Sequence, residues 1–225
     1  MPVALITGAS RGLGRALAEE LARRGWDLVV DARHGEALSA VSGEHVPGDV
    51  TDPAHRDALV RAVADRGGPD LLVNNASTLG ASPMPAVADL DDRILQETLL
   101  TNVVAPHALT RALLPRLLER RGVVMNITSD ASVEAYPGWG AYGASKAALD
   151  HLTRILAAEQ PALRVYAVDP GDMRTQMHAD AFPGENISDR PEPETVVPHL
   201  LALLASDLPS GRYRAADVPV LEASA

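Results

Sequence analysis

The chain has 225 residues, a formal net charge of −10 and no cysteine, which together exclude several classes of protein. The acidic balance leaves no positive surplus to neutralise phosphates, so sequence-independent nucleic-acid binding is not expected. The lack of cysteine excludes disulfides, thiolate metal sites and a cysteine nucleophile. We find no signal peptide and no apolar run near the roughly 20 residues of a membrane span, so we expect a soluble, cytoplasmic protein.

Short apolar runs alternate with longer helical patterns, and this alternation predicts βαβ units that build a parallel sheet. Strands are expected at residues 3–7, 28–30, around 46–49, 71–73, 122–127 and 164–168. Helices are expected at 14–24, at about 89–114 with an interruption near Pro106, and at 142–159. Right-handed crossovers would cover both faces of the sheet. We therefore expect an α/β fold, a doubly wound three-layer sandwich with a mainly parallel sheet of about seven strands.

The length suits one domain, which we take to cover residues 1–225. Residues 172–198 differ from the rest because they carry Pro183, Gly184, Pro191 and Pro193 among scattered apolar side chains. We interpret this stretch as a loop excursion inside the domain.

A glycine-rich segment joins the first strand to the first helix. It reads Thr7-Gly8-Ala9-Ser10-Arg11-Gly12-Leu13-Gly14. Glycines at such a place permit a tight turn and a close approach of the backbone to a pyrophosphate, and the helix N-terminus adds free N–H groups. The segment therefore predicts a dinucleotide site, although an ordinary strand-to-helix turn has a similar composition.

Lys146 is the only lysine of the chain, beside nineteen arginines, and it follows Tyr142 by four positions. On a helix this spacing places both side chains on one face. Lowering a phenol pKa from near 10 to neutrality takes about 4 kcal/mol. One cation at roughly 5 Å supplies about 3 kcal/mol at an effective dielectric of about 20. The pair therefore predicts a proton-transferring tyrosine, with the remainder left to a positively charged cofactor.

Ser129 follows an apolar strand, at the carboxyl edge where open α/β sheets bind ligands. Its hydroxyl is placed to hydrogen-bond a substrate oxygen and stabilise charge there. The loop 130–141 contains Pro137, Gly138 and Gly140, which would let the chain bring Tyr142 back beside Ser129.

The spacing of Gly8, Gly12 and Gly14 resembles the T-G-x-x-x-G-x-G motif of the short-chain dehydrogenase/reductase (SDR) family, which has a Rossmann-like fold. Further matches follow in the family's order over most of the chain. They are Asp49-Val50, Asn74-Asn75-Ala76-Ser77 (with Ser77 where glycine is usual), Asn102, Ser129, Tyr142-x-x-x-Lys146 and Pro170-Gly171-x-x-x-Thr175.

The resemblance implies roles for these residues. The catalytic set would be Asn102, Ser129, Tyr142 and Lys146, with Asn102 holding a water that connects Lys146 to solvent. Tyr142 would protonate the substrate oxygen during reduction while the cofactor carries the hydride. The cofactor would contact Gly8, Ser10, Arg11, Gly12, Leu13, Gly14, Arg33, Asp49, Val50, Asn75, Ala76, Tyr142, Lys146, Pro170, Gly171 and Thr175. Residues 172–198 would form a lid over the substrate.

The choice between NADP and NAD depends on the end of the second strand. In the family an acid there selects NAD, and a basic residue one position later, or in the glycine loop, holds the extra phosphate of NADP. Our register places Ala32 at the acid position and Arg33 at the basic one, with Arg11 in the glycine loop, which favours NADP(H). A slip by one residue would instead place Asp31 on the ribose and favour NAD.

Two alternative functions remain open from the sequence. A non-catalytic NADP-binding regulatory protein is one, although relatives of that kind usually lose the tyrosine or the lysine. A sugar-nucleotide epimerase is another, but it needs a larger C-terminal domain.

The end of the chain, 210–216, resembles a compact last strand without the family's D-G-G tail, so a homodimer through the long helices is favoured over a tetramer. The seven histidines show no ligand spacing, and no metal site is expected.

Overall fold

A computed structural model describes residues 1–220, and its strands form one seven-stranded, all-parallel sheet in the order β3-β2-β1-β4-β5-β6-β7. The strands are β1 (Val3–Ile6), β2 (Asp27–Ala32), β3 (Glu44–Pro47), β4 (Leu71–Asn74), β5 (Val123–Ile127), β6 (Arg164–Asp169) and β7 (Gly211–Arg214). The expected fold class is confirmed. The last five residues of the expected domain, 221–225, lie outside the described part of the chain.

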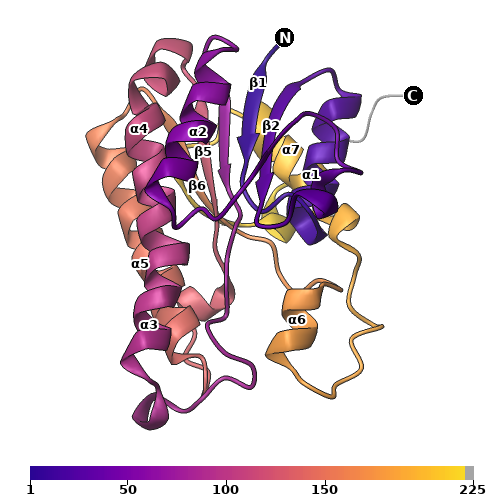
Figure 1. Ribbon diagram of the computed structural model, residues 1–225, viewed down its shortest axis with the longest axis vertical. Coiled ribbons are helices and arrows are strands. Elements are labelled where there is room, and N and C mark those ends of the chain that lie inside the picture. The colour runs from indigo at the N-terminus through magenta and orange to yellow at the C-terminus, as the bar shows by residue number, and fades with distance from the viewer. Residues whose placement is uncertain (221–225) are drawn as a thin grey trace.

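Helices cover both faces of the sheet (Figure 1). They are α1 (Gly12–Arg23), α2 (Pro53–Ala64), α3 (Asp92–Leu99), α4 (Ala105–Arg120), α5 (Gly140–Glu159), α6 (Gln176–Ala181) and α7 (Val197–Ala205). Helices α1 and α7 pack on one face, and α2, α4 and α5 on the other. Within residues 1–220 no helix is long and apolar enough to cross a bilayer.

The core consists of two apolar clusters, one on each side of the sheet. Alternate side chains of β1 point to opposite faces, so Val3 and Leu5 join one cluster while Ala4 and Ile6 join the other. A strand buried on both faces needs apolar residues at every position, and all four residues of β1 are buried. This explains why the strands appear in the sequence as short continuous apolar runs.

The expected long helix at 89–114 differs most from the structure. It is three consecutive segments: α3, a π-helical turn at Leu100–Val104, and α4, which runs on to Arg120. The interruption precedes Pro106 because proline fits the first turn of a helix, where its missing N–H is not needed. Pro115 lies inside α4 without ending it.

Helices α2 and α7 had no range in the sequence prediction. Asp52 caps α2 by accepting a hydrogen bond from the Ala54 N–H, and Pro53 occupies its first position. The stretch 172–198 is not loop throughout, because α6 lies within it and α7 begins at Val197.

All seven strands end at the same edge of the sheet because they are parallel. In Figure 1 this edge points downward, and α6 lies below it, across from the lower ends of α3 and α5. The loops that follow β1, β2, β4, β5 and β6 therefore meet in the region that α6 faces.

Candidate active site

A cavity of about 580 Å³ extends along the carboxyl edge of the sheet. Of the expected site residues, its lining contains Gly8, Ser10, Arg11, Gly12, Leu13, Arg33, Asp49, Val50, Asn75, Ala76, Ser129, Tyr142, Lys146, Pro170, Gly171 and Thr175. Two expected residues, Gly14 and Asn102, do not line it. The fold therefore brings residues from seven segments of the chain to one cavity.

The glycine-rich loop after β1 lines one part of the cavity. Gly8 has φ +67°, and a Cβ there would lie 2.8 Å from the Ala76 Cα, so only glycine fits. Gly14 is set behind the wall, where a Cβ would meet the Gly8 carbonyl at 2.6 Å. The Arg11 side chain does not cap α1, and the first turn holds no acid, so the free N–H groups suit an anion such as a pyrophosphate.

At the end of β2, the two residues on which the cofactor registers depend have different surroundings. Asp31 is 1% exposed, and its two carboxylate oxygens already have partners: the Gly8 N–H at 2.7 Å and His55 Nε2 at 3.0 Å. Burial raises the pKa of Asp31, while its hydrogen bonds with His55 and Gly8 act against that shift. Asp31 and Arg33 both line the cavity, but Arg33 is exposed and makes no ion pair with any residue of 1–220.

Tyr142 and Lys146 lie together on α5, as their spacing predicts. The Lys146 Nζ lies 5.5 Å from the centre of the Tyr142 ring and donates a hydrogen bond to the Ile127 carbonyl at 2.7 Å. Both side chains are buried, with Tyr142 7% and Lys146 2% exposed. They nevertheless border the cavity, which gives a ligand access to both.

The protonation of this pair differs from the expectation. Burial raises the pKa of Tyr142, with Asp130 and Asp169 adding to it, and hydrogen bonds with the Ser129 and Ser77 hydroxyls oppose the shift. Burial lowers the pKa of Lys146 to about 8, and Asp150 acts against that. The ammonium does not overcome desolvation of the phenol, because each group loses its water. The protein alone therefore holds Tyr142 protonated at neutral pH.

Ser129 lies two residues after the end of β5 and lines the cavity with Tyr142. Its hydroxyl donates to Asp130 Oδ1 at 2.9 Å and accepts from the Ala131 N–H at 3.2 Å. Gly143 allows α5 to pass close to this turn, since a Cβ there would lie 2.8 Å from the Ala131 carbonyl oxygen. The loop thus returns Tyr142 to Ser129.

Asn102 sits in the π-helical turn and is 1% exposed. Its amide donates to the Thr78 carbonyl and the Ser145 hydroxyl, each at 2.9 Å, and its oxygen accepts from the Thr78 N–H at 2.9 Å and the Ser77 hydroxyl at 3.1 Å. All hydrogen-bonding positions of the side chain are used. Its side chain therefore pins the loop after β4 to α5 and has no position left for a water.

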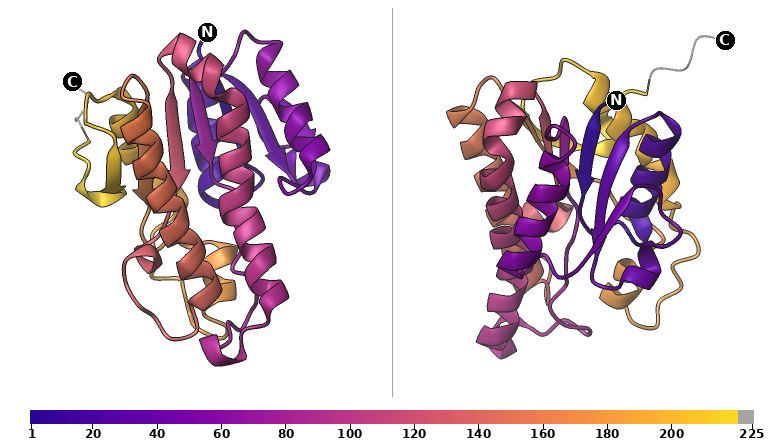
Figure 2. Two further views of the ribbon diagram at one scale, coloured as in Figure 1. Left: turned by 90° about the vertical axis from the view of Figure 1, so that its left-hand side faces the viewer. Right: turned by 45° about the horizontal axis from the view of Figure 1, so that its top comes forward.

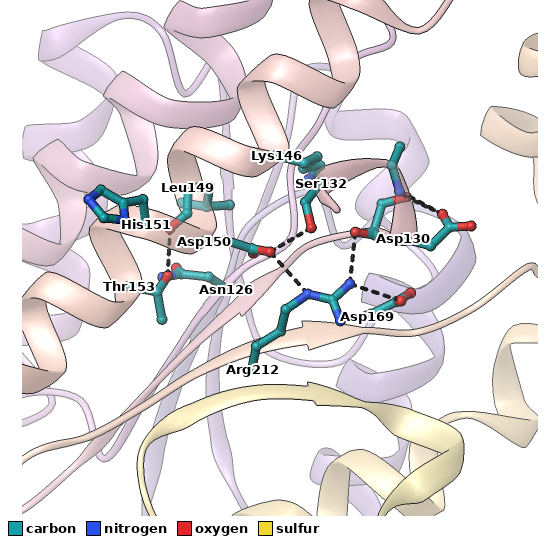
Figure 3. Close-up of polar contacts among 12 residues, drawn as sticks. Asn126, Asp130, Ser132, Lys146, Leu149, Asp150, His151, Thr153, Asp169 and Arg212 are labelled. Carbon is teal, nitrogen blue, oxygen red and sulfur yellow. Dashed lines mark hydrogen bonds and ion pairs between the residues drawn. The ribbon is translucent and has the colours of Figure 1, made fainter. Parts of the chain in front are cut away.

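Arg212 on β7 is a site neighbour that sequence reasoning missed (Figure 3). Its guanidinium bonds Asp150 Oδ2 at 3.0 Å, Asp169 Oδ2 at 3.1 Å and the Ser129 carbonyl at 3.0 Å. The three partners belong to α5, the end of β6 and the turn after β5. Arg212 therefore ties together the segments that carry Tyr142 with Lys146, Pro170-Gly171 and Ser129.

Nothing in the described residues suggests a metal centre. Within 1–220 no three histidine or carboxylate side chains are grouped closely enough to hold an ion. The expectation of a metal-free site remains a prediction.

We predict that Arg212→Met lowers the free energy of unfolding by about 3 kcal/mol, because removing one partner leaves two buried carboxylates unpaired. Urea denaturation measures the loss. Arg214→Met is the matched control, since Arg214 is exposed on the same strand and makes no ion pair within residues 1–220. The control should stay within about 0.5 kcal/mol of wild type. Equal effects of the two substitutions would contradict the role of the Arg212 cluster.

A second prediction concerns Lys146 and pH. Its pKa of about 8 lies below its ordinary value of 10.5, so the unfolded chain binds more protons than the folded one between these values. The stability of wild type relative to Lys146→Met should therefore rise with pH across this window, by up to about 3 kcal/mol. Urea denaturation of both proteins from pH 7 to pH 10 measures the difference. A difference that stays flat would show that Lys146 is not desolvated.

Comparison with known proteins agrees with this geometry. Residues 2–186 match the short chain dehydrogenase family. A serine 3-dehydrogenase of Rhizobium radiobacter is 35% identical over 182 residues, covering 76% of this chain and 72% of that protein. A sepiapterin reductase of Bos taurus is 34% identical over 195 residues, covering 77% of this chain and 73% of that protein.

Among solved structures, a short chain dehydrogenase from Shigella flexneri in complex with NADP superposes with a TM-score of 0.87 at 28% identity. The superposition covers 96% of this chain and 97% of that one. The agreement therefore extends over nearly the whole of both chains. With the family match, it shows that the chain belongs to the short-chain dehydrogenase family and is an NAD(P)-dependent oxidoreductase.

Proposed function

We propose that the protein transfers a hydride between NADP(H) and a carbonyl or secondary alcohol substrate, with Tyr142 as the general acid and base. The observation that carries this proposal is the meeting of Ser129, Tyr142 and Lys146 in one wall of the cavity that begins at the glycine loop. The bound nicotinamide would supply the hydride. The side chains of the protein would then transfer the proton and hydrogen-bond the substrate oxygen.

Tyr142 is suited to donate a proton. Its phenol is buried and its pKa is raised, so it stays protonated at neutral pH until a substrate oxygen beside it gains negative charge. The Ser129 hydroxyl would hydrogen-bond the same oxygen and hold it in place. These properties favour reduction of a carbonyl as the direction in which the protein alone is ready to act.

Lys146 lies beside the Tyr142 ring, with its Nζ 5.5 Å from the ring centre. One of its three N–H groups is fixed by the Ile127 carbonyl, which directs the ammonium along the cavity wall. The remaining N–H groups are available for the cofactor ribose, as the family resemblance implies. A bound partner of this kind would favour the charged form of Lys146 and, through it, ionisation of Tyr142 when an alcohol is oxidised.

The cofactor end fits NADP better than NAD. The Asp31 carboxylate is committed to Gly8 and His55, so it is not free to bridge two ribose hydroxyls. Arg33 and Arg11 both line the cavity, and guanidinium groups bind phosphate well. The Shigella flexneri relative in complex with NADP supports the same choice.

We also propose that two copies associate through α4 and α5, which run side by side on one flank of the molecule (Figure 2). Val104 and Ile155, on this flank, leave 46% and 40% of their surface exposed. Covering such apolar side chains favours association. Sedimentation equilibrium should then give twice the 23.7 kDa mass of one chain.

Tyr142→Phe should lower kcat by about a thousandfold while leaving NADPH binding within a few fold, because only the transferable proton is removed. NADPH oxidation with a panel of ketones and aldehydes measures turnover, and fluorescence titration measures binding. Tyr213→Phe is the control, since that hydroxyl bonds only the Pro209 carbonyl. Full turnover by a folded Tyr142→Phe protein would contradict the mechanism. An absence of NADPH consumption in wild type with every carbonyl would instead favour the non-catalytic regulatory alternative.

Arg33→Ala should lower the preference for NADPH over NADH by about tenfold or more, since one charge-assisted contact to the phosphate is lost. The ratio of kcat/KM for the two cofactors measures this preference. Arg61→Ala is the control, because Arg61 is exposed on α2 and does not line the cavity. An unchanged ratio in Arg33→Ala would show that the NADP assignment is wrong.

A further inference from the structure

Most of the aromatic side chains of this chain gather beside the proposed acid. The chain has only four tyrosines, two tryptophans and one phenylalanine, and Tyr136, Trp139, Tyr142 and Phe182 form one group. Trp139 is at its centre, with ring centroids 5.9 Å from Tyr136, 5.6 Å from Tyr142 and 5.7 Å from Phe182. Two members of this group, Trp139 and Tyr142, line the cavity.

The indole of Trp139 is part of the cavity wall rather than only a support for the lid. It borders the cavity next to Tyr142, together with the apolar residues Leu79, Met177 and Ala181. A substrate whose oxygen lies at the Tyr142 hydroxyl would therefore rest its substituent against an aromatic and aliphatic surface. Such a surface favours a flat ring, which gains edge-to-face or stacked contacts as well as burial.

The charges at this end of the cavity are unbalanced toward the negative. Asp130 lines the cavity, its carboxylate bonds the hydroxyls of Ser129 and Tyr136 at 2.9 Å each, and it forms no ion pair with the described residues. Asp172 also lines the cavity, but Arg190 at 3.6 Å and His178 at 3.7 Å lie against it. Asp130 is therefore the carboxylate at this end of the cavity that no cation of the described residues pairs with.

The arginine and lysine side chains that line the cavity do not pair with Asp130. Among residues 1–220 they are Arg11, Arg33 and Lys146, of which Lys146 lies beside Tyr142 but is buried and bonded to the Ile127 carbonyl. Arg33 follows β2, which is three strands from β5 in the sheet, so it lies roughly 14 Å from Ser129 at about 4.8 Å per strand. Arg212 lies behind Ser129, but it does not line the cavity and is already paired with Asp150 and Asp169. A carboxylate on the substrate would therefore meet Asp130 with no uncommitted arginine nearby to pair with it.

Resting on the carbonyl reduction proposed above, we propose that the site takes uncharged carbonyl compounds that carry an aromatic ring and discriminates against those that carry a carboxylate. In the reaction the carbonyl carbon accepts a hydride from the reduced nicotinamide, and the oxygen accepts the proton of Tyr142. The products are the alcohol and the oxidised cofactor. Asp130 and Trp139 are the residues that determine this specificity.

Two aldehydes that differ in charge test the proposal: methyl 4-formylbenzoate and 4-formylbenzoate, each with NADPH and the purified wild-type protein. We expect kcat/KM for the ester to exceed that for the carboxylate by about tenfold or more, from repulsion by one nearby carboxylate. Asp130→Asn should reduce the ester-to-carboxylate ratio by about fivefold or more. The ratio cancels any effect of the substitution on the chemistry that the two aldehydes share.

Glu134→Gln is the matched control, because Glu134 is an exposed acid on the same loop that does not line the cavity, and its ratio should stay within twofold of wild type. The aromatic preference is tested with benzaldehyde against cyclohexanecarbaldehyde, and Trp139→Ala should remove the preference for benzaldehyde.

A wild-type ester-to-carboxylate ratio near one, or a ratio unaffected by Asp130→Asn, would overturn the inference while leaving carbonyl reduction intact. So would a benzaldehyde preference that Trp139→Ala retains. A protein that reduces no aldehyde or ketone overturns the proposed function and this inference with it.

Discussion

A buried ammonium next to a buried phenol is the constraint around which the site is organised. Lys146 is 2% exposed, and a cation removed from water is stable only when other groups replace its hydration. The Ile127 carbonyl supplies one hydrogen bond and Asp150 supplies compensating charge. These are enough to keep the pKa of Lys146 at about 8, and the adjacent phenol stays protonated. Tyr142 is thus protonated, and its hydroxyl lies beside the position proposed for the substrate oxygen.

The same constraint explains the polar groups behind the site. Asp150, which compensates Lys146, would itself be unstable without a cation, and Arg212 provides that cation while also pairing with Asp169. Because those acids belong to α5 and β6, the ion pairs also fix the distance between the helix that carries Tyr142 and the loop that begins at Pro170. One edge-strand side chain therefore stabilises both the charge and the geometry of the site.

Sequence reasoning predicted the fold class, the family and those parts of the site that depend on local spacing. The glycine loop, Tyr142 with Lys146, and Pro170-Gly171 each lie within a few residues, so one strand or helix fixes their geometry. Arg212 could not be predicted, because it is 83 positions from Ser129 and lacks a local pattern. The interruption near Pro106 was expected, but its π-helical form at Leu100–Val104 could not be predicted, since the sequence there continues the helical pattern. The raised pKa of Tyr142 in the protein without cofactor could not be predicted, because burial cannot be read from spacing.

Titration of the Tyr142 phenol tests the central claim most directly. Carbon-13 NMR of ring-labelled tyrosine, assigned with the Tyr142→Phe protein, can follow this phenol in wild type and in Lys146→Met, with and without NADP. The account predicts that without cofactor its pKa lies above the ordinary value of 10 in the wild-type protein. It also predicts that saturating NADP lowers the pKa in wild type, and lowers it far less in Lys146→Met. A phenol that titrates at the same pH in both proteins when NADP is bound would contradict the account.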